Sequence, residues 1–241
     1  MKIHDGFQQH SLEWLNARAG KLTASEADRL VSPLGKVRTG EGVKTLMLEK
    51  LAERWLGAPL PKEASTFAME QGNILEEFAL PAFELETGMK LQRVAFIETD
   101  DGTCGCSPDA VVEGQEIGVE AKAPGIVNHL RYLLDGTLPS DYILQVQFSM
   151  FVTGWSEWYF TSFRRRMPPL ILRIMRDEEM QDAIREATED FNERLEDAWT
   201  EVLKLNGGKP PIRQPFTPTP GPVRFTWETT PQPTNIDEVV P

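Results

Sequence analysis

Cysteine and histidine are scarce in this chain of 241 residues, which has two of the former and three of the latter. Cys104 and Cys106 are too close in sequence for a relaxed disulfide. His4, His10 and His129 are scattered, so neither an iron–sulfur cluster nor a structural zinc site is expected. We predict that both thiols are packed in the interior.

Long apolar runs are also lacking in the sequence. No stretch is apolar for long enough to cross a membrane, and the polar start Met1-Lys2-Ile3-His4-Asp5 lacks the apolar core of a signal peptide. A cytoplasmic protein without membrane contact is therefore expected. With 40% hydrophobic residues, the chain can bury one sizeable core and need not form more than one domain.

Positive charge is in deficit, because 25 Lys and Arg residues face 37 Asp and Glu residues, for a net charge of −12. A generic DNA-binding protein would be basic. The excess is localised, however: residues 177–204 hold eleven acids and three bases, or −8 of the −12. Apolar residues recur there at helical spacing, so we predict a long helix with an acidic outer face.

The most informative segment runs from Ser107 to Lys122 and is predicted to form a β-hairpin. Gly114-Gln115 supplies a tight turn, and a two-residue turn there pairs Asp109 with Glu120. A four-residue loop over the same segment would keep this register. The turn is flanked by strand-favouring residues, namely Val111, Val112, Ile117 and Val119.

This register puts Ser107, Asp109, Glu120 and Lys122 on one face of the hairpin. Opposed carboxylates repel each other unless a divalent cation lies between them, and oxygen ligands suit Mg²⁺ or Mn²⁺ rather than zinc. Lys122 could orient an attacking water or offset charge on a phosphate. Pro108 cannot donate a ladder hydrogen bond and predicts a bend before Asp109. A surface hairpin with a solvated acid and lysine pair is the structural alternative, but the apolar residues that follow argue against it.

The order Pro-Asp, spacer, Glu-x-Lys resembles the PD-(D/E)xK nuclease signature. Three more segments resemble motifs of the lambda exonuclease, or YqaJ-type viral recombinase, family: 14–26 at the N-terminal side, 72–76 with a helical glutamate, and 145–150 with glutamines. The four motifs follow the family's order and cover about residues 11 to 165.

The resemblance implies an α/β (α+β) fold with a restriction-endonuclease-like core, in which helices flank a central mixed β-sheet. It implies a Mg²⁺-dependent exonuclease that degrades one strand of linear double-stranded DNA from 5′ to 3′ and leaves 3′ overhangs for phage-type recombination by strand annealing. A homotrimeric ring threaded by a DNA end, a single-strand annealing protein as partner and a bacterial or phage-infected host cell are further implications. Two alternatives stay open: another PD-(D/E)xK endonuclease, and a non-catalytic scaffold that binds DNA ends.

The predicted catalytic site centres on Asp109 and Glu120, which would hold Mg²⁺ or Mn²⁺ with help from the carbonyl of Ala121. Lys122 would help to generate hydroxide. Taken alone, Glu76, on a helix predicted over residues 73–87, would be an ordinary surface glutamate. Its spacing from Gly72 resembles the family motif, and this resemblance implies that it is a third acidic ligand of the metal or the water. Met69, seven residues before Glu76, could split the duplex end as an apolar wedge, or could be an ordinary core methionine.

Two glutamines on a buried helix predicted over Ser140–Thr153, with Ser140 as its cap, are further candidates. Gln147 shares the apolar stripe with Met150, whereas Gln145 shares its side with Ser149. A buried amide needs a partner, so we expect Gln147 to support the catalytic site and rank Gln145 lower, as a DNA contact.

A phosphate site is predicted near the N-terminus. Ser11 would cap a helix that ends at Gly20, and Thr23 with Glu26 would form a capping box for the next helix. Arg18 then ends one helix while Ser25 begins the next, where backbone NH groups favour an anion. Read from the residues alone, Arg18 could equally cap carbonyls; the family resemblance favours a DNA phosphate. Ser107 is grouped with this site.

Two basic clusters could contact DNA or be ordinary surface: Lys36 with Arg38, and Arg164, Arg165 and Arg166.

The predicted organisation is an exonuclease domain over residues 1–206 followed by a tail over 207–241. Strands are expected at 91–99, 103–112, 117–123, 157–163 and 170–175, and helices at 128–134, 140–153 and 177–204. The tail holds nine of the 18 prolines without periodicity, so we expect it to be extended. Its aromatic residues, Phe216, Phe225 and Trp227, could dock on a neighbouring subunit.

Overall fold

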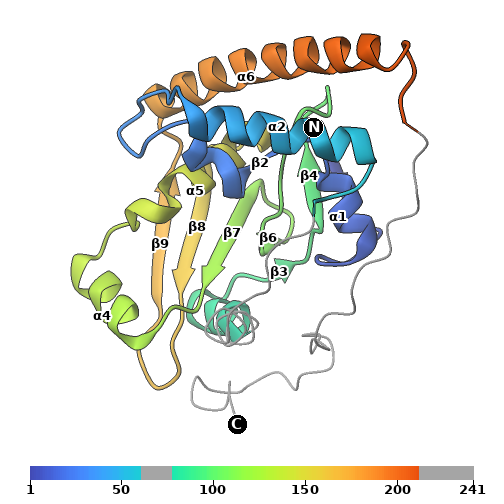
Figure 1. Ribbon diagram of the computed structural model, residues 1–241. Coiled ribbons are helices and arrows are strands. Elements are labelled where there is room, and N and C mark those ends of the chain that lie inside the picture. The colour runs from blue at the N-terminus through green and yellow to red at the C-terminus, as the bar shows by residue number, and fades with distance from the viewer. Residues whose placement is uncertain (61–77, 212–241) are drawn as a thin grey trace.

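The computed structural model describes residues 1–60 and 78–211 (Figure 1). The strands are β1 (Lys2–His4), β2 (Leu22–Thr23), β3 (Leu91–Gln92), β4 (Phe96–Glu98), β5 (Cys104–Cys106), β6 (Ala110–Val112), β7 (Ile117–Lys122), β8 (Glu157–Ser162) and β9 (Leu170–Met175). The helices are α1 (Leu12–Arg18), the 3₁₀ helix η1 (Ala24–Arg29), α2 (Glu41–Leu56), α4 (Ile126–Asp135), α5 (Ser140–Thr153) and α6 (Glu178–Leu205), and residues 78–87 are also helical. Predicted residues outside the described ranges are Met69, Glu76, Phe216, Phe225 and Trp227.

The strands form two mixed sheets rather than the single central sheet that was predicted. The four-stranded sheet has the order β1-β4-β5-β2 and the five-stranded sheet the order β3-β6-β7-β8-β9. In the larger sheet β7 and β8 are parallel, whereas β6–β7 and β8–β9 are antiparallel. The predicted α+β class with a mixed sheet flanked by helices is confirmed.

The two sheets are joined by one bent hairpin. Each of the strands predicted over 91–99 and 103–112 is interrupted, the first at residues 93–95 and the second at 107–109. Pro108 lies in the second break, which confirms the bend expected there. Propensity alone does not show the first break, because residues 93–95 are Arg, Val and Ala, which include neither Gly nor Pro, and Val favours strands.

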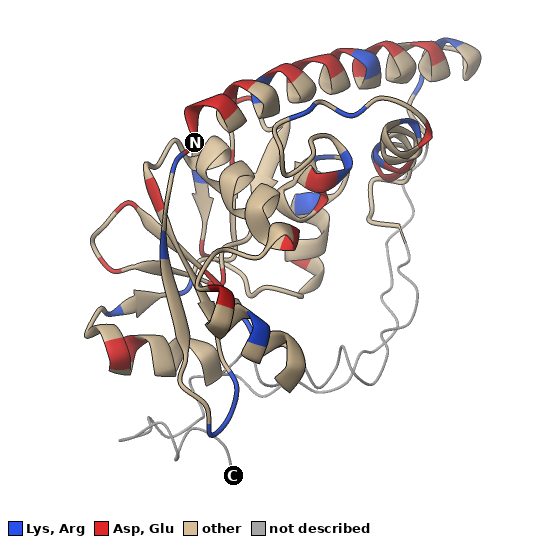
Figure 2. Cartoon of the chain, turned by 90° about the vertical axis from the view of Figure 1, so that its left-hand side faces the viewer, with Lys and Arg blue, Asp and Glu red and all other residues tan. Residues whose placement is uncertain are grey.

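The helices cover the sheets and close the core (Figure 1). α5 has the predicted bounds, but its N-cap is Pro139, and Ser140 makes no capping hydrogen bond. α6 begins after Asp177, whose side chain accepts a hydrogen bond of 3.1 Å from the amide of Met180. Its buried stripe includes Ile184, Phe191 and Leu195, while its acidic residues face outward along the whole helix, as Figure 2 shows.

Both cysteines are free and buried, as predicted. Burial raises the pKa of Cys104 to about 11 and that of Cys106 to about 12, so both thiols stay protonated and unreactive at neutral pH. In the described part of the chain, no helix is both long and apolar enough to cross a membrane.

Candidate active site

The hairpin of β6 and β7 has the predicted register. Ala110 pairs with Val119 and Val111 with Gly118, so Asp109 lies opposite Glu120. The amide of Asp109 donates a hydrogen bond of 3.0 Å to the carbonyl of Val119, which continues the pairing to the residue before β6. The connecting loop has four residues, 113–116, and Gly114 adopts a φ of +71° that suits glycine.

Glu120 is the buried carboxylate of this site, with 2% of its surface exposed. Its Oε1 lies 2.6 Å from Nζ of Lys122 and accepts a hydrogen bond of 2.5 Å from Nε2 of Gln145 on α5. A buried charge is tolerated only when it is paired and hydrogen-bonded. Lys122 and Gln145 therefore hold the Glu120 carboxylate in one position.

Asp109 faces the same place from the other side of the hairpin. Its Oδ2 accepts a hydrogen bond of 2.7 Å from the amide of Ala121, and its side chain is half-buried. The carbonyl of Val119 points toward Asp109, and alternate residues of a strand point the same way, so the carbonyl of Ala121 also faces Asp109. The register thus puts the two carboxylates on one face of the hairpin, and the carbonyl of Ala121 lies on the side of β7 that faces β6.

This donor set fits a divalent cation such as Mg²⁺, which prefers oxygen ligands and usually binds through one or two carboxylates. Within residues 1–60 and 78–211, no group of three or more His, Cys, Asp or Glu side chains could hold a metal ion. The predicted third acid, Glu76, lies outside these ranges.

Of the two glutamines of α5, the one that contacts Glu120 is Gln145, which was ranked lower, and not Gln147. Gln145 contacts Glu120, whereas Gln147 donates to the carbonyl of Met175 at 3.0 Å and accepts from the amide of Asp177 at 3.1 Å. Gln147 also accepts a hydrogen bond of 2.9 Å from Nε2 of Gln181. Helical spacing identified Gln147 correctly as a buried amide with partners, but these partners join α5 to α6 and not to the hairpin.

Arg18 donates hydrogen bonds to three hydroxyl groups, one of which belongs to Ser107, two residues before Asp109. Its Nη1 donates to Oγ of Ser107 at 3.0 Å, and its Nη2 donates to Oγ1 of Thr23 at 3.3 Å and to Oγ of Ser25 at 3.2 Å. The guanidinium also lies 4.4 Å from the ring centroid of Trp14. The predicted trio Arg18, Ser25 and Ser107 is therefore brought together.

Arg18 supplies the positive charge of this cluster, and Glu26, the acid that acts on it most strongly, accepts hydrogen bonds from Thr23. Burial lowers the pKa of Arg18, and the negative charge of Glu26 opposes this shift. Arginine stays charged at any physiological pH, so a charged guanidinium is held among neutral hydroxyls. Such an arrangement suits an anion, and a phosphate in particular.

The segment that carries Arg18 is fixed by α2. The amide of Gly20 donates to Glu53 at 2.8 Å, and the buried Lys50 pairs with Glu26 at 2.8 Å and with Glu53 at 3.1 Å. Glu26 also accepts a hydrogen bond of 3.1 Å from the amide of Thr23, as the predicted capping box requires. Burial alone would raise the pKa of Glu26, but Lys50 and Thr23 lower it below its ordinary value.

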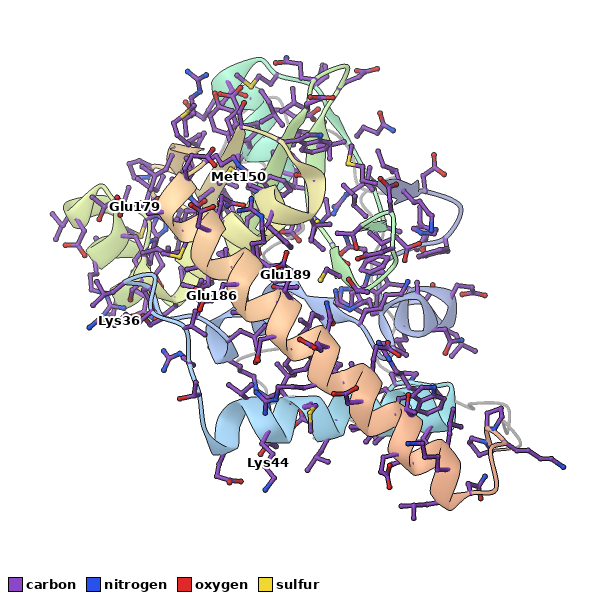
Figure 3. All side chains as sticks on the ribbon, turned by 90° about the horizontal axis from the view of Figure 1, so that it is seen from above. Lys36, Lys44, Met150, Glu179, Glu186 and Glu189 are labelled. Carbon is purple, nitrogen blue, oxygen red and sulfur yellow. The ribbon has the colours of Figure 1, made fainter. Side chains whose placement is uncertain are left out.

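The two basic clusters lie at different ends of the molecule. Arg164–Arg166 follow β8 at the end of the sheet where β7 also ends. The amide of Phe163, directly after β8, donates a hydrogen bond of 2.8 Å to the carbonyl of Lys122, the last residue of β7. Figures 1 and 3 place the loop of Lys36 and Arg38 beside the first turns of α6 instead. Of the two clusters, Arg164–Arg166 is the one that lies at the end of the sheet where Lys122 ends β7.

Two contacts of the site have no signal in the local sequence. Nε1 of Trp14 donates a hydrogen bond of 2.8 Å to Oγ of Ser107. Nε2 of Gln9 donates to the carbonyl of Pro108 at 2.7 Å. A single glutamine before the first helix has no periodicity or motif that would identify such a role.

Comparisons with known proteins show which family and which solved structures the chain resembles. The family described as YqaJ-like viral recombinase domain matches residues 13–156. The chain is 28% identical to LHK-Exo, an alkaline exonuclease from Laribacter hongkongensis, over 82% of this chain and 98% of that one, with a TM-score of 0.71. The structure of LHK-Exo in complex with dAMP gives the same values.

A phage-related exonuclease from Haemophilus somnus 129PT shares the fold, at 15% identity and a TM-score of 0.59 over 76% of this chain and 96% of that one. Comparison with curated proteins gave no match.

Proposed function

This chain belongs to the YqaJ-like viral recombinase family, whose structural relatives are exonucleases, and from this premise we propose that it is a Mg²⁺-dependent exonuclease acting 5′ to 3′ on linear double-stranded DNA. The family supports a nuclease role in recombination. One observation carries the finer proposal: Ser107 of the Arg18 cluster and Asp109 of the carboxylate pair are two residues apart on one bent segment. An anchored phosphate would therefore lie close to the cutting site.

Asp109, Glu120 and the carbonyl of Ala121 would hold Mg²⁺, or Mn²⁺ in its place. When bound, the cation would lower the pKa of a water molecule and offset negative charge on the phosphate. Lys122, fixed by its ion pair with Glu120, positions its ammonium group beside the attacking water and the scissile phosphate. Gln145 keeps Oε1 of Glu120 in place, and we assign it a positioning role in the site.

The Arg18 cluster would bind the 5′ phosphate of the strand being degraded. Arg18 offers two nitrogen atoms in a fixed fork, which matches the geometry of phosphate oxygens, and the hydroxyls of Ser25 and Ser107 lie beside it. The LHK-Exo complex holds dAMP, a deoxynucleoside monophosphate and thus of the class that an exonuclease releases. End recognition through a 5′ phosphate would explain a 5′ to 3′ polarity.

Several broader proposals rest on the family resemblance. They are a trimeric ring around the DNA end, cooperation with a single-strand annealing protein in phage-type recombination, and a cytoplasmic location. Glu76 as a third acid and Met69 as a wedge remain proposals of the same kind, as does the division into a nuclease domain over residues 1–206 and a tail over 207–241.

Digestion of linear duplexes with and without a 5′ phosphate, in Mg²⁺ and in EDTA, tests the proposal. We expect degradation from 5′ ends in Mg²⁺, faster on phosphorylated ends, and none in EDTA. Asp109→Asn and Lys122→Met should each lower kcat by about 100-fold or more. Lys44→Met, which removes an exposed lysine of α2, should cut like the parent.

Other outcomes would identify the alternatives. Cutting of supercoiled circles would point to an endonuclease, because an exonuclease needs an end. DNA binding without cleavage under any metal condition would point to a scaffold. Full activity in both Asp109→Asn and Lys122→Met would show that the proposed site is wrong.

A further inference from the structure

The bent hairpin that carries Asp109 loses its ladder of hydrogen bonds at the bend. β3 pairs with β6 and β4 pairs with β5 in one uninterrupted register, but the residues between them, 93–95 and 107–109, belong to no strand. Continuing the register would place Val94 opposite Asp109. Both Val94 and Pro108 are buried, so their carbonyl groups need donors from elsewhere.

Gln9 supplies these donors from outside the hairpin. Its Nε2 donates to the carbonyl of Val94 at 3.1 Å and to the carbonyl of Pro108 at 2.7 Å, so one side chain spans both sides of the break. Two more side chains reinforce the bend. Nη1 of Arg93 donates to the carbonyl of Asp109 at 3.0 Å, and Nε1 of Trp14 donates to the carbonyl of Ala95 at 3.1 Å.

The bend determines where Asp109 lies relative to Glu120. Glu120 belongs to the regular strand β7 and is held by Lys122 and Gln145, so its position does not depend on the bend. Asp109 follows Pro108 directly, and Pro108 has no amide with which to join a ladder. Asp109 is joined to β7 through its amide and its carboxylate, which bind Val119 and Ala121. The residue before it is held on the opposite side through the carbonyl of Pro108, and Gln9 is the side chain bound to that carbonyl.

We propose that Gln9 is a positioning residue of the metal site: by replacing the missing ladder between Val94 and Pro108, it holds Asp109 at the separation from Glu120 that a divalent cation requires. This inference rests on the proposed function, because it takes Asp109 as a metal ligand. Gln9 itself touches neither metal nor DNA in this scheme. It couples the N-terminal segment that bears Arg18 to the loop that bears Asp109.

Gln9→Met in the full chain tests this role, because methionine keeps the length of the side chain and removes both hydrogen bonds. Gln8→Met is the matched control, since Gln8 is the exposed neighbour. Calorimetry with Mn²⁺ should show binding weaker by roughly 5- to 30-fold in Gln9→Met than in Gln8→Met, the loss expected for two hydrogen bonds. The Mg²⁺ concentration for half-maximal cleavage should rise by a similar factor, while saturating Mg²⁺ restores kcat and the KM for DNA stays near that of the parent.

Equal Mn²⁺ affinity in Gln9→Met and Gln8→Met would overturn the inference. Asp109→Ala separates this failure from that of the proposed function: if Asp109→Ala abolishes Mn²⁺ binding while Gln9→Met matches its control, only the role of Gln9 is wrong. Unchanged Mn²⁺ binding in Asp109→Ala would refute the metal site itself. Gln9→Asn, whose amide is too short to span the break, provides a second variant; it should weaken Mn²⁺ binding as well, and binding like that of Gln8→Met would overturn the inference.

Discussion

At the scale of single residues, the site depends on which polar side chains the buried carboxylate of Glu120 can reach. Lys122 lies two residues along the same strand, and Gln145 comes from α5. A carboxylate that is only 2% exposed gains from each charge-assisted hydrogen bond, because water cannot replace a lost partner. Gln145 and Gln147, two residues apart on one helix, therefore have separable effects.

Gln145→Leu should lower kcat by about 10-fold, since loss of one charge-assisted hydrogen bond of roughly 1.4 kcal/mol lets Glu120 move. Gln147→Leu should instead lower the free energy of unfolding by about 1 to 3 kcal/mol, because it leaves the carbonyl of Met175 and the amide of Asp177 without their partner. Cleavage assays at saturating Mg²⁺ and urea unfolding of both variants measure the two effects. A loss of kcat in Gln147→Leu without a loss of stability would contradict this assignment.

The chemistry of the hairpin could be predicted from the sequence because strand alternation determines it locally. A two-residue turn and a four-residue loop both place Asp109 opposite Glu120, and the structure has this register. The choice between Gln145 and Gln147 depends on which elements pack on each side of α5. Helical periodicity does not show which elements pack on α5. The ranking of the two glutamines as partners of the carboxylate site was therefore reversed.

At the scale of elements, long periodic segments were predicted well and interrupted strands were not. α5 and β9 have the predicted bounds, and α6 differs by one residue at each end. The breaks at 93–95 and 107–109 depend on side chains of the N-terminal segment that bind the backbone from outside. In the sequence, only the break at 107–109 was indicated, by Pro108. A proline lacks an amide hydrogen wherever it stands, whereas a contact from a distant segment cannot be read from the local sequence.

His129 joins three elements and makes stability depend on pH. Its Nε2 donates to the carbonyl of Pro168 at 3.0 Å, so its Nδ1 accepts from the hydroxyl of Ser162 at 2.8 Å in the neutral ring. This links α4 to β8 and to the loop of Arg164–Arg166. Burial lowers the pKa of His129 below its ordinary value of 6.5, although the hydrogen bond to Pro168 opposes the shift.

Because the unfolded chain binds a proton more readily at His129 than the folded chain does, stability from this residue is present above a pH of 6.5 and is lost as the pH falls through the lowered pKa. The free energy of unfolding should therefore fall more between about pH 8 and about pH 5.5 in the parent than in His129→Gln. Denaturant unfolding at both pH values measures this difference. His4 and His10 are common to both proteins, and an equal fall in both would assign the pH dependence to them or to other groups.

At the scale of the whole molecule, charge is divided between two ends. The acidic outer face of α6 covers one end, and the Arg164–Arg166 loop lies at the other, near the C-terminal end of β7 (Figure 2). The net charge of −12 is compatible with DNA binding because the excess of acids lies away from the hairpin of Asp109 and Glu120. Lys36 lies beside α6 in Figure 3, and the acids of this helix would repel a DNA backbone near the loop that carries Lys36 and Arg38.

Replacing one exposed arginine from each cluster tests this division. Arg166→Gln should weaken binding of a 5′-phosphorylated duplex and reduce the salt dependence of the binding constant by roughly one unit of slope, as expected for one lost phosphate contact. Arg38→Gln should leave both unchanged. Fluorescence anisotropy in EDTA between about 50 and about 200 mM salt measures binding without cleavage. The opposite result, in which Arg38→Gln reduces the salt dependence and Arg166→Gln does not, would contradict this division. DNA would then cross the α6 side of the molecule, and the end of the sheet beside Lys122 would contact only the terminal nucleotide.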